Sequence, residues 1–353
     1  VIFGMMNKLQ FYVLVIFSVV LSLVLPFVLP ERFFLDAILI VKDPWDEKGW
    51  LGSYPISMMF YHLTKLGKLP FSIVALIQLP ILYFILRLVG IPERFQIFTI
   101  KNILIYLCFI MMAVFIGQPS KEFFTFIFIG IIVLLFQQKV LSLGICLLIS
   151  FIMFFIFGAV FRPYFTFVPI ISIGIFLITR IRFKNRWILG IVAGIAVIVL
   201  LSFSYSLVKG EFFSAMTRET INLERMNKEN ADTMLVSPIA PTNIFGEAFA
   251  TVYGFISVNF PINALKFFYK PQVVAFVVWQ LLLTWIIVVR FGYLLKDYTE
   301  RKKEFWLMLF FLSYLVIQAI FEPDLGSAVR HKIGILPLIY FLFYYDEFKR
   351  KLQ

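Results

Sequence analysis

The residues best suited to chemistry lie at positions 321–332, Phe-Glu-Pro-Asp-Leu-Gly-Ser-Ala-Val-Arg-His-Lys, between two apolar runs. Glu322, Asp324 and His331 carry groups that can accept or donate a proton. Arg330 presents a planar set of donors that matches phosphate oxygens. This stretch therefore combines side chains for proton transfer with one that can bind a phosphorylated group.

Two other polar stretches carry the same residue types. Lys121 and Glu122 follow Gln118-Pro119-Ser120, and Arg162 precedes Pro163-Tyr164. The guanidinium of Arg162 is a second candidate for phosphate binding. Ionisable groups beside long apolar runs are costly to bury, so by default they suggest function.

Each of these residues also has a purely structural explanation. Ser120 could N-cap a helix whose first turn contains Glu122, and Asp324 could N-cap a second helix. Lys121 and Arg162 could simply extend to a membrane interface. The sequence leaves both explanations open.

An acidic group at Asp43, Asp46 and Glu47 could be a solvated loop, a general base or a metal site. A metal site needs oxygen ligands that converge at a fixed geometry, and three neighbouring acids alone are weak support for one. No P-loop, GxSxG or zinc-ligand spacing occurs, which disfavours ATP-driven transport and serine hydrolase chemistry. No metal ligand is therefore assigned.

The chain that positions these residues is far more apolar than a soluble domain. Of its 353 residues 61% are hydrophobic and 19% aromatic, whereas soluble domains are near half apolar. The apolar residues come in runs of about 16 to 23, close to the length that crosses a bilayer as a helix. Since a helix satisfies its own backbone polar groups in hydrocarbon, the sequence predicts an all-α, polytopic transmembrane protein. We expect one integral membrane domain over residues 1–353.

About ten spans are predicted, and the basic residues orient them. The spans are 9–29, 70–90, 101–117, 122–137, 140–160, 163–179, 187–208, 272–292, 305–321 and 332–345. With the N-terminus inside, the inner segments hold 17 basic and 6 acidic residues, and the longer outer segments hold 15 and 14. Positive charge favours the cytoplasmic side, so both termini are expected there. We expect the first span to be retained rather than cleaved as a signal peptide.

The net charge of +12 is thus mainly a topology signal, and nucleic acid is not expected as a partner. Two outer segments, residues 30–69 and 209–271, are long enough to suggest function. Within the second, residues 217–230 are predicted to form a solvated helix. Residues 246–268 contain prolines and polar side chains and are predicted to form a re-entrant or interfacial helix pair. With this topology, the three polar stretches described above and the 209–245 loop fall on the same outer face.

Three motifs resemble those of the Wzy-type polysaccharide polymerases of the bacterial inner membrane. They are Pro-Ser-Lys-Glu at the start of one span, Arg-Pro-Tyr at the end of another, and Gly-Ser-Ala-Val-Arg-His-Lys-(x4)-Pro at the start of the last. The Phe-rich hydropathy profile resembles that family over the whole chain. The resemblance implies a fold of the glycosyltransferase C superfamily. It also implies polymerisation of undecaprenyl-pyrophosphate-linked repeat units of O-antigen or capsule at the periplasmic face, without nucleotide sugar, cofactor or essential metal.

The partners implied by this resemblance are lipid-linked glycans and the bilayer, and such enzymes can work with a chain-length regulator protein. A hydroxyl of one lipid-linked unit would attack the anomeric carbon of the growing glycan, and pyrophosphate would leave on its lipid. Arg162 and Arg330, with Lys121 assisting, would stabilise the charge that develops on the leaving group.

A base must take the proton of the attacking hydroxyl. Glu122, Asp324 or His331 could do so, and the sequence does not rank them. Glu322 and Tyr164 are the candidates for contact with the glycan.

Two other functions fit the same profile. A membrane glycosyltransferase that uses a polyprenyl-phosphate sugar would place its base at Asp43 or Asp46. A flippase of lipid-linked oligosaccharide would line a path from inside to outside with charges, whereas the interiors of the predicted spans are nearly bare of them.

Overall fold

The computed structural model describes residues 2–42, 49–181, 186–225 and 233–352, and its regular secondary structure over these ranges is helical. No strand occurs in the described ranges, where an isolated bridge joins Met234 and Asp324. The chain divides into two compact units, residues 1–163 with 330–353, and residues 164–329. The all-helical prediction is therefore confirmed, and the prediction of one integral membrane domain stays a prediction.

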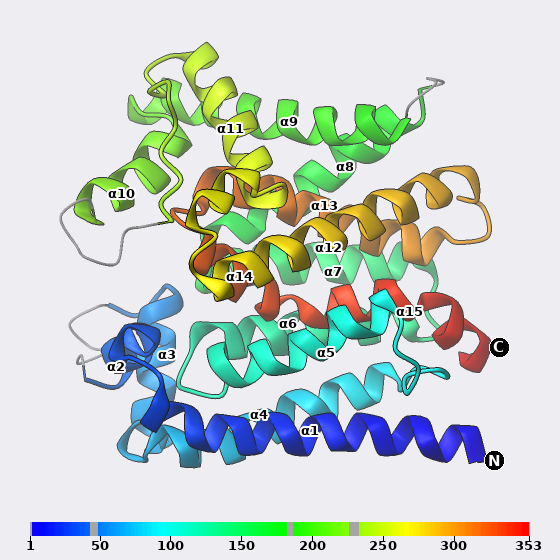
Figure 1. Ribbon diagram of the computed structural model, residues 1–353. Coiled ribbons are helices and arrows are strands. Elements are labelled where there is room, and N and C mark those ends of the chain that lie inside the picture. The colour runs from blue at the N-terminus through cyan, green and yellow to red at the C-terminus, as the bar shows by residue number, and fades with distance from the viewer. Residues whose placement is uncertain (1, 43–48, 182–185, 226–232, 353) are drawn as a thin grey trace. The chain divides into compact units, whose positions relative to one another are not determined.

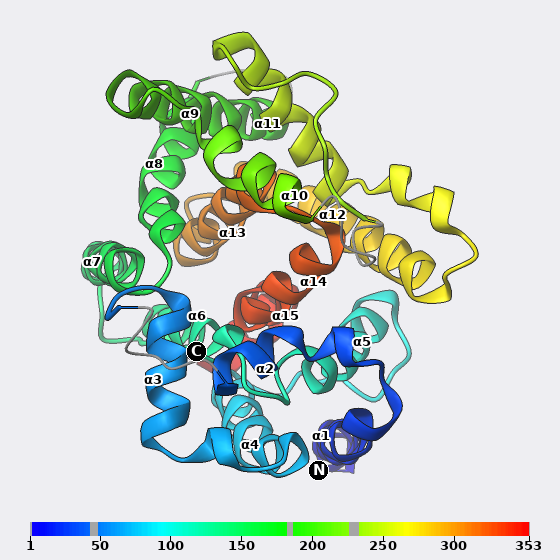
Figure 2. The same cartoon turned by 90° about the vertical axis from the view of Figure 1, so that its left-hand side faces the viewer.

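Apolar helices of different lengths build the first unit (Figure 1). They are α1 (Ile2–Val28), α2 (Leu35–Lys42), α3 (Ser53–Leu63), α4 (Phe71–Val89), α5 (Ile100–Phe115), α6 (Lys121–Gln137), α7 (Leu143–Val160) and α15 (Leu336–Leu352). Two short 3-10 helices, Glu31–Phe33 and Leu66–Lys68, flank α2 and α3. Helix α1 packs on α4 and α5, and α15 packs on α4 and α6. Figure 2 views the end of this unit at which α2 and α3 lie.

The second unit contains α8 (Phe167–Thr179), α9 (Arg186–Lys209), α10 (Thr220–Arg225), α11 (Ile244–Asn259), α12 (Pro271–Lys296) and α13 (Lys302–Phe321). Helix α14 (Leu325–Gly334) begins in this unit, and its last residues, from Arg330, belong to the first. Helix α8 packs on α9 and α13, and α11 packs on α9 and α13.

Six helices are long and apolar enough to cross a membrane, and they are α1, α4, α7, α9, α12 and α13. Each coincides with one of the predicted spans. Helices α5 and α8 are apolar but shorter, and α6 has 17 residues. The prediction of a helical membrane protein is confirmed at this level, and the count of ten spans stays a prediction.

The last predicted span, 332–345, does not match a single helix. The chain leaves α14 at Gly334 and enters α15 at Leu336, and Tyr344 has non-helical backbone angles inside α15. The predicted helix pair at 246–268 corresponds to α11 followed by a 3-10 helix, Ile262–Phe267. Its position relative to a membrane stays a prediction.

Segments predicted to share the cytoplasmic side meet within each unit. In the first unit the Glu93 amide donates to Glu347 Oε2 at 2.7 Å, and Lys101 Nζ lies 3.2 Å from Glu347 Oε1. In the second unit the Arg180 guanidinium lies 4.9 Å from the centre of the Tyr298 ring. These contacts agree with the grouping of helix ends deduced from the basic residues.

The predicted solvated helix at 217–230 is wrong where it starts. A π-helix, Ala215–Glu219, leads into α10 there, and the Arg218 side chain within it is fully buried. The Arg218 guanidinium donates to the carbonyls of Ala250 at 3.2 Å and Ala319 at 2.8 Å. A charged group can be buried only with such partners, and the charge-rich sequence around it did not reveal them. Residues 226–230 lie outside the described ranges.

A glycine allows α11 and α13 to approach closely at this point. A Cβ atom on Gly254 would overlap both the Ala319 carbonyl oxygen and the Arg218 guanidinium. The first of these is backbone, so the two helices would have to separate to admit a methyl group.

We therefore expect Gly254→Ala to destabilise the second unit by about 1–3 kcal/mol, the usual cost of overpacking. Gly292→Ala is the matched control, because nothing lies within 4 Å of a Cβ built there. Thermal unfolding in detergent, followed by the fluorescence of the buried Trp279 and Trp306, measures both variants. Equal unfolding temperatures for the two variants would contradict this description of the packing.

Candidate functional site

The first turn of α6 places two charged side chains inside the first unit. Ser120 is the N-cap, and its hydroxyl accepts a hydrogen bond from the Phe123 amide at 3.3 Å. The Ser120 amide in turn donates to the Tyr61 hydroxyl at 3.1 Å. Lys121 and Glu122 follow directly and are both buried. The capping explanation for Ser120 is thus confirmed, and the burial of Lys121 disfavours the alternative in which its side chain simply extends to an interface.

Arg162 and His331 both approach the buried Glu122 carboxylate. Helix α7 ends where the amides of Phe161 and Arg162 both bond the Phe157 carbonyl, and Pro163 then prevents its continuation. Arg162 Nη2 lies 2.6 Å from Glu122 Oε1, and the two side chains are 3% and 1% exposed. His331 Nε2 lies 3.3 Å from the same oxygen.

Asp36, at the start of α2, holds the other two cations. Arg330 Nη1 lies 2.6 Å from Asp36 Oδ2, and Lys121 Nζ lies 3.3 Å from the same oxygen. The Tyr54 hydroxyl, on α3, donates to Asp36 Oδ1 at 3.0 Å. Lys121 Nζ also lies 3.5 Å from the centre of the Tyr54 ring, a cation–π contact.

Together these residues form what we call the cation cluster, which comprises Asp36, Tyr54, Lys121, Glu122, Arg162, Arg330 and His331. All belong to the first unit. Two carboxylates face two guanidinium groups and one ammonium group, so the side chains of the cluster sum to one net positive charge when Lys121 is protonated and the imidazole is neutral. An excess of positive charge in a buried site is suited to an anionic ligand.

The charge state of the Asp36 carboxylate follows from its neighbours. Burial raises the pKa of Asp36, but the Arg330 and Lys121 cations together lower it further, to about 2. Asp36 is therefore ionised at neutral pH and is a weak base. Burial and the adjacent Asp36 carboxylate raise the pKa of the Tyr54 phenol, which keeps its proton and donates it.

The structure thus brings together five of the eight side chains singled out in the sequence: Lys121, Glu122, Arg162, Arg330 and His331. The other three, Tyr164, Glu322 and Asp324, belong to the second unit.

Asp324 caps α14 in the way its sequence position suggested. Its Oδ1 accepts from the Ser327 amide and its Oδ2 from the Ser327 hydroxyl, both at 2.8 Å. Because both oxygens serve the helix start, the structure favours the capping explanation over a role as base. Leu325, the first residue of α14, donates its amide to the Thr233 carbonyl at 3.3 Å.

Glu322 and Tyr164 are both more enclosed than glycan-binding residues on a rim would be. Glu322 is 3% exposed and accepts from Gln318 Nε2 at 2.8 Å. The Tyr164 ring packs 5.2 Å from the Phe165 ring and 5.4 Å from the Phe321 ring. Their role in contacting the glycan stays a prediction.

Sequence reasoning missed Asp36 and Tyr54. The available signal was a lone carboxylate in the apolar segment Leu35–Val41, in the first outer segment. The acids that drew attention instead, Asp43, Asp46 and Glu47, lie outside the described residues.

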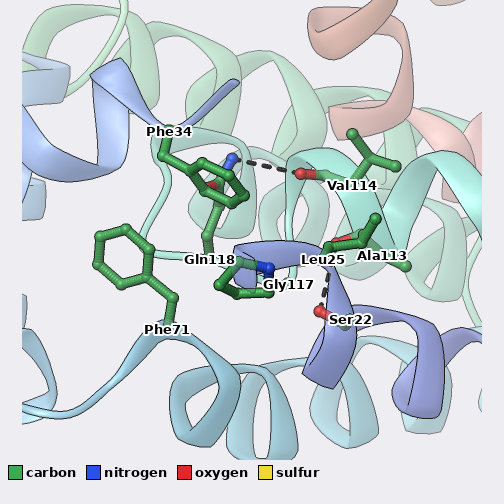
Figure 3. Close-up of a pocket in the computed structure, with 9 residues that line it drawn as sticks. Ser22, Leu25, Phe34, Phe71, Ala113, Val114, Gly117 and Gln118 are labelled. Carbon is green, nitrogen blue, oxygen red and sulfur yellow. Dashed lines mark hydrogen bonds between the residues drawn. The ribbon is translucent and has the colours of Figure 1, made fainter. Parts of the chain in front are cut away.

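No group of three or more His, Cys, Asp or Glu side chains is arranged to hold a metal ion among the residues that the structure describes. A small pocket lies elsewhere in the first unit, where α1, α4 and α5 meet (Figure 3). Its lining is mostly apolar, and Gln118 Nε2 donates there to the Val114 carbonyl at 3.2 Å. The pocket contains no member of the cation cluster, and ligand pockets are usually larger.

Comparison of the chain with protein family models, with curated proteins and with solved structures finds no match. The functional argument therefore rests on the geometry of the cation cluster and on the sequence motifs.

Proposed function

We propose that this protein polymerises undecaprenyl-pyrophosphate-linked oligosaccharide units into O-antigen or capsular polysaccharide at the outer face of a bacterial inner membrane. One observation carries the proposal: two guanidinium groups and one ammonium group converge on two carboxylates in an apolar, helical protein. The three cations are Lys121, Arg162 and Arg330. Each lies in a different one of the three motifs that resemble those of the polymerases.

The cluster offers what loss of a diphosphate leaving group requires. As the acceptor hydroxyl bonds to the anomeric carbon, the bond from that carbon to the diphosphate oxygen breaks, and negative charge develops on that oxygen. Arg162 and Arg330 would stabilise this charge with planar donor sets, and Lys121 would add a third cation. Such stabilisation is strongest where water is excluded, and Arg162 is only 3% exposed.

The contacts favour His331 as the base that takes the hydroxyl proton. Glu122 Oε1 is already shared between Arg162 and His331, and the carboxylate is 1% exposed. With a proton on Nε2 directed at Glu122, the imidazole carries its lone pair on Nδ1, which can accept the proton of the hydroxyl. Glu122 would then position His331 rather than act on the substrate itself.

Removal of either guanidinium should slow chain growth. We expect Arg330→Ala and Arg162→Ala each to reduce the rate of polymerisation by about 100-fold or more, as loss of a charge-stabilising donor does in other active sites. Arg32→Ala is the control, because Arg32 is exposed and lies in the 3-10 helix just before α2. The assay measures polymer length on gels with purified protein and lipid-linked oligosaccharide. Normal chain growth in both correctly folded alanine variants would rule out this site.

The same assay separates the polymerase from the two alternatives. A flippase does not lengthen the glycan in detergent, because it only moves the lipid-linked unit across a bilayer. A membrane glycosyltransferase of the alternative type adds single sugars and requires a polyprenyl-phosphate sugar as its donor. Only a polymerase joins whole repeat units without any further donor.

The role of His331 can be tested through the pH dependence of the rate. We expect His331→Gln to lower kcat by about 100-fold with little change in KM, since loss of a general base costs roughly 10²–10⁴-fold. The wild-type rate should rise with pH as one group loses its proton, and the variant should lack that rise. His62→Gln, which alters the only other histidine at an exposed position on α3, should behave as wild type. An unchanged pH profile in His331→Gln would place the base elsewhere.

A further inference from the structure

The two carboxylates of the cation cluster differ in how firmly they are held. Glu122 is 1% exposed and is bonded by Arg162 from one side and His331 from the other. Asp36 is 27% exposed, more than Lys121 or Arg330, and it stands on a helix of eight residues. The Glu122 carboxylate is therefore enclosed, whereas the Asp36 side chain is partly exposed even though its Oδ2 atom is buried between the cations.

The surroundings of Asp36 are those expected for a phosphate. Its Oδ2 lies between Arg330 Nη1 at 2.6 Å and Lys121 Nζ at 3.3 Å, and its Oδ1 accepts the Tyr54 hydroxyl at 3.0 Å. A guanidinium, an ammonium and a phenol are all hydrogen-bond donors that can bind phosphate oxygens in the way they bind the carboxylate of Asp36. Asp36 thus occupies the place that an anionic ligand of the cluster would take.

We infer that Asp36 is a built-in competitor, which holds Arg330 and Lys121 while the site is empty and leaves them when a diphosphate binds. This inference rests on the proposed function, because it takes the diphosphate of a lipid-linked glycan as the ligand. A diphosphate brings two or more negative charges and several acceptor oxygens to the same two cations. A carboxylate left beside it would be repelled, and the Asp36 side chain, which is 27% exposed, would turn outward.

The exchange also has a use after the reaction. The product lipid diphosphate has lost its glycan and carries one more ionisable oxygen than the donor did. Its affinity for three cations would therefore be high, and release would be slow. Return of Asp36 to Arg330 and Lys121 supplies a replacement anion, so the cations need not be left unpaired in a buried site when the product departs.

The test is a binding measurement with the full chain in detergent, with farnesyl diphosphate and inorganic pyrophosphate as probes. We expect Asp36→Asn to bind both probes about tenfold more tightly than wild type, because the competing charge is gone while the hydrogen bond to Tyr54 can persist. Asp297→Asn is the matched control, since Asp297 is a half-exposed partner of Arg301 in the second unit. It should bind both probes as wild type does.

Equal or weaker binding by Asp36→Asn would overturn the inference and leave the proposed function standing. Tightening with farnesyl diphosphate alone would also overturn it, because the competition concerns the diphosphate group. Saturable binding of neither probe to wild type or variant would instead remove the proposed function, and the inference with it.

Hydrogen exchange on the wild-type chain tests the same point without a substitution. If Asp36 leaves its partners, the amides of α2 should exchange faster when farnesyl diphosphate is bound. Slower exchange in α2 would mean that Asp36 binds together with the ligand, and the inference would be wrong even if the variant failed to fold.

Discussion

Mutual neutralisation of buried charges is the constraint on which the cation cluster of the first unit depends. A charge taken out of water needs a partner nearby, and breaking a buried pair is strongly destabilising. Arg162 and Glu122 satisfy this need for each other at 2.6 Å, and Arg330 and Asp36 do the same. Within the cluster the cations outnumber the carboxylates by one. A bound anion would complete the balance, which links the stability of this region to its proposed function.

Local sequence explains how each member of the cluster reaches its place. The Ser120 cap starts α6 so that Lys121 and Glu122 fall in its first turn, and the Asp324 cap starts α14 so that Arg330 follows near its end. Pro163 directs the chain away from α7 just after Arg162. The charged side chains thus stand at helix ends, where backbone geometry changes and where apolar spans give way to polar groups.

Much of this arrangement was predictable because polarity and topology are local properties. Lys121, Arg162 and Arg330 each lie at the end of an apolar run, and alternation of the spans assigns those ends to one face. What could not be predicted is which distant groups pair with each charged side chain. Asp36 has ordinary apolar neighbours in the chain, and only the approach of α2 to Lys121 and Arg330 reveals it as a partner. The same holds for Arg218, whose carbonyl partners come from two distant helices.

The division of roles among the carboxylates also required the fold. Capping and proton transfer were equally open for Asp324 until both of its oxygens were found on Ser327. In the proposed mechanism Glu122 positions His331 rather than acting as the base, because Arg162 and His331 both contact a single oxygen of Glu122. In a chain with few charged groups inside, the hydrogen bonds of each one decide what chemistry is left to it.

The central claim is that the cations of this cluster bind a diphosphate. Its most direct test is an experimental structure of the full chain with farnesyl diphosphate bound. The account predicts phosphate oxygens about 2.8 Å from the guanidinium groups of Arg162 and Arg330, the usual length of such charged hydrogen bonds. A diphosphate bound elsewhere, with both guanidinium groups still on Glu122 and Asp36, would contradict it.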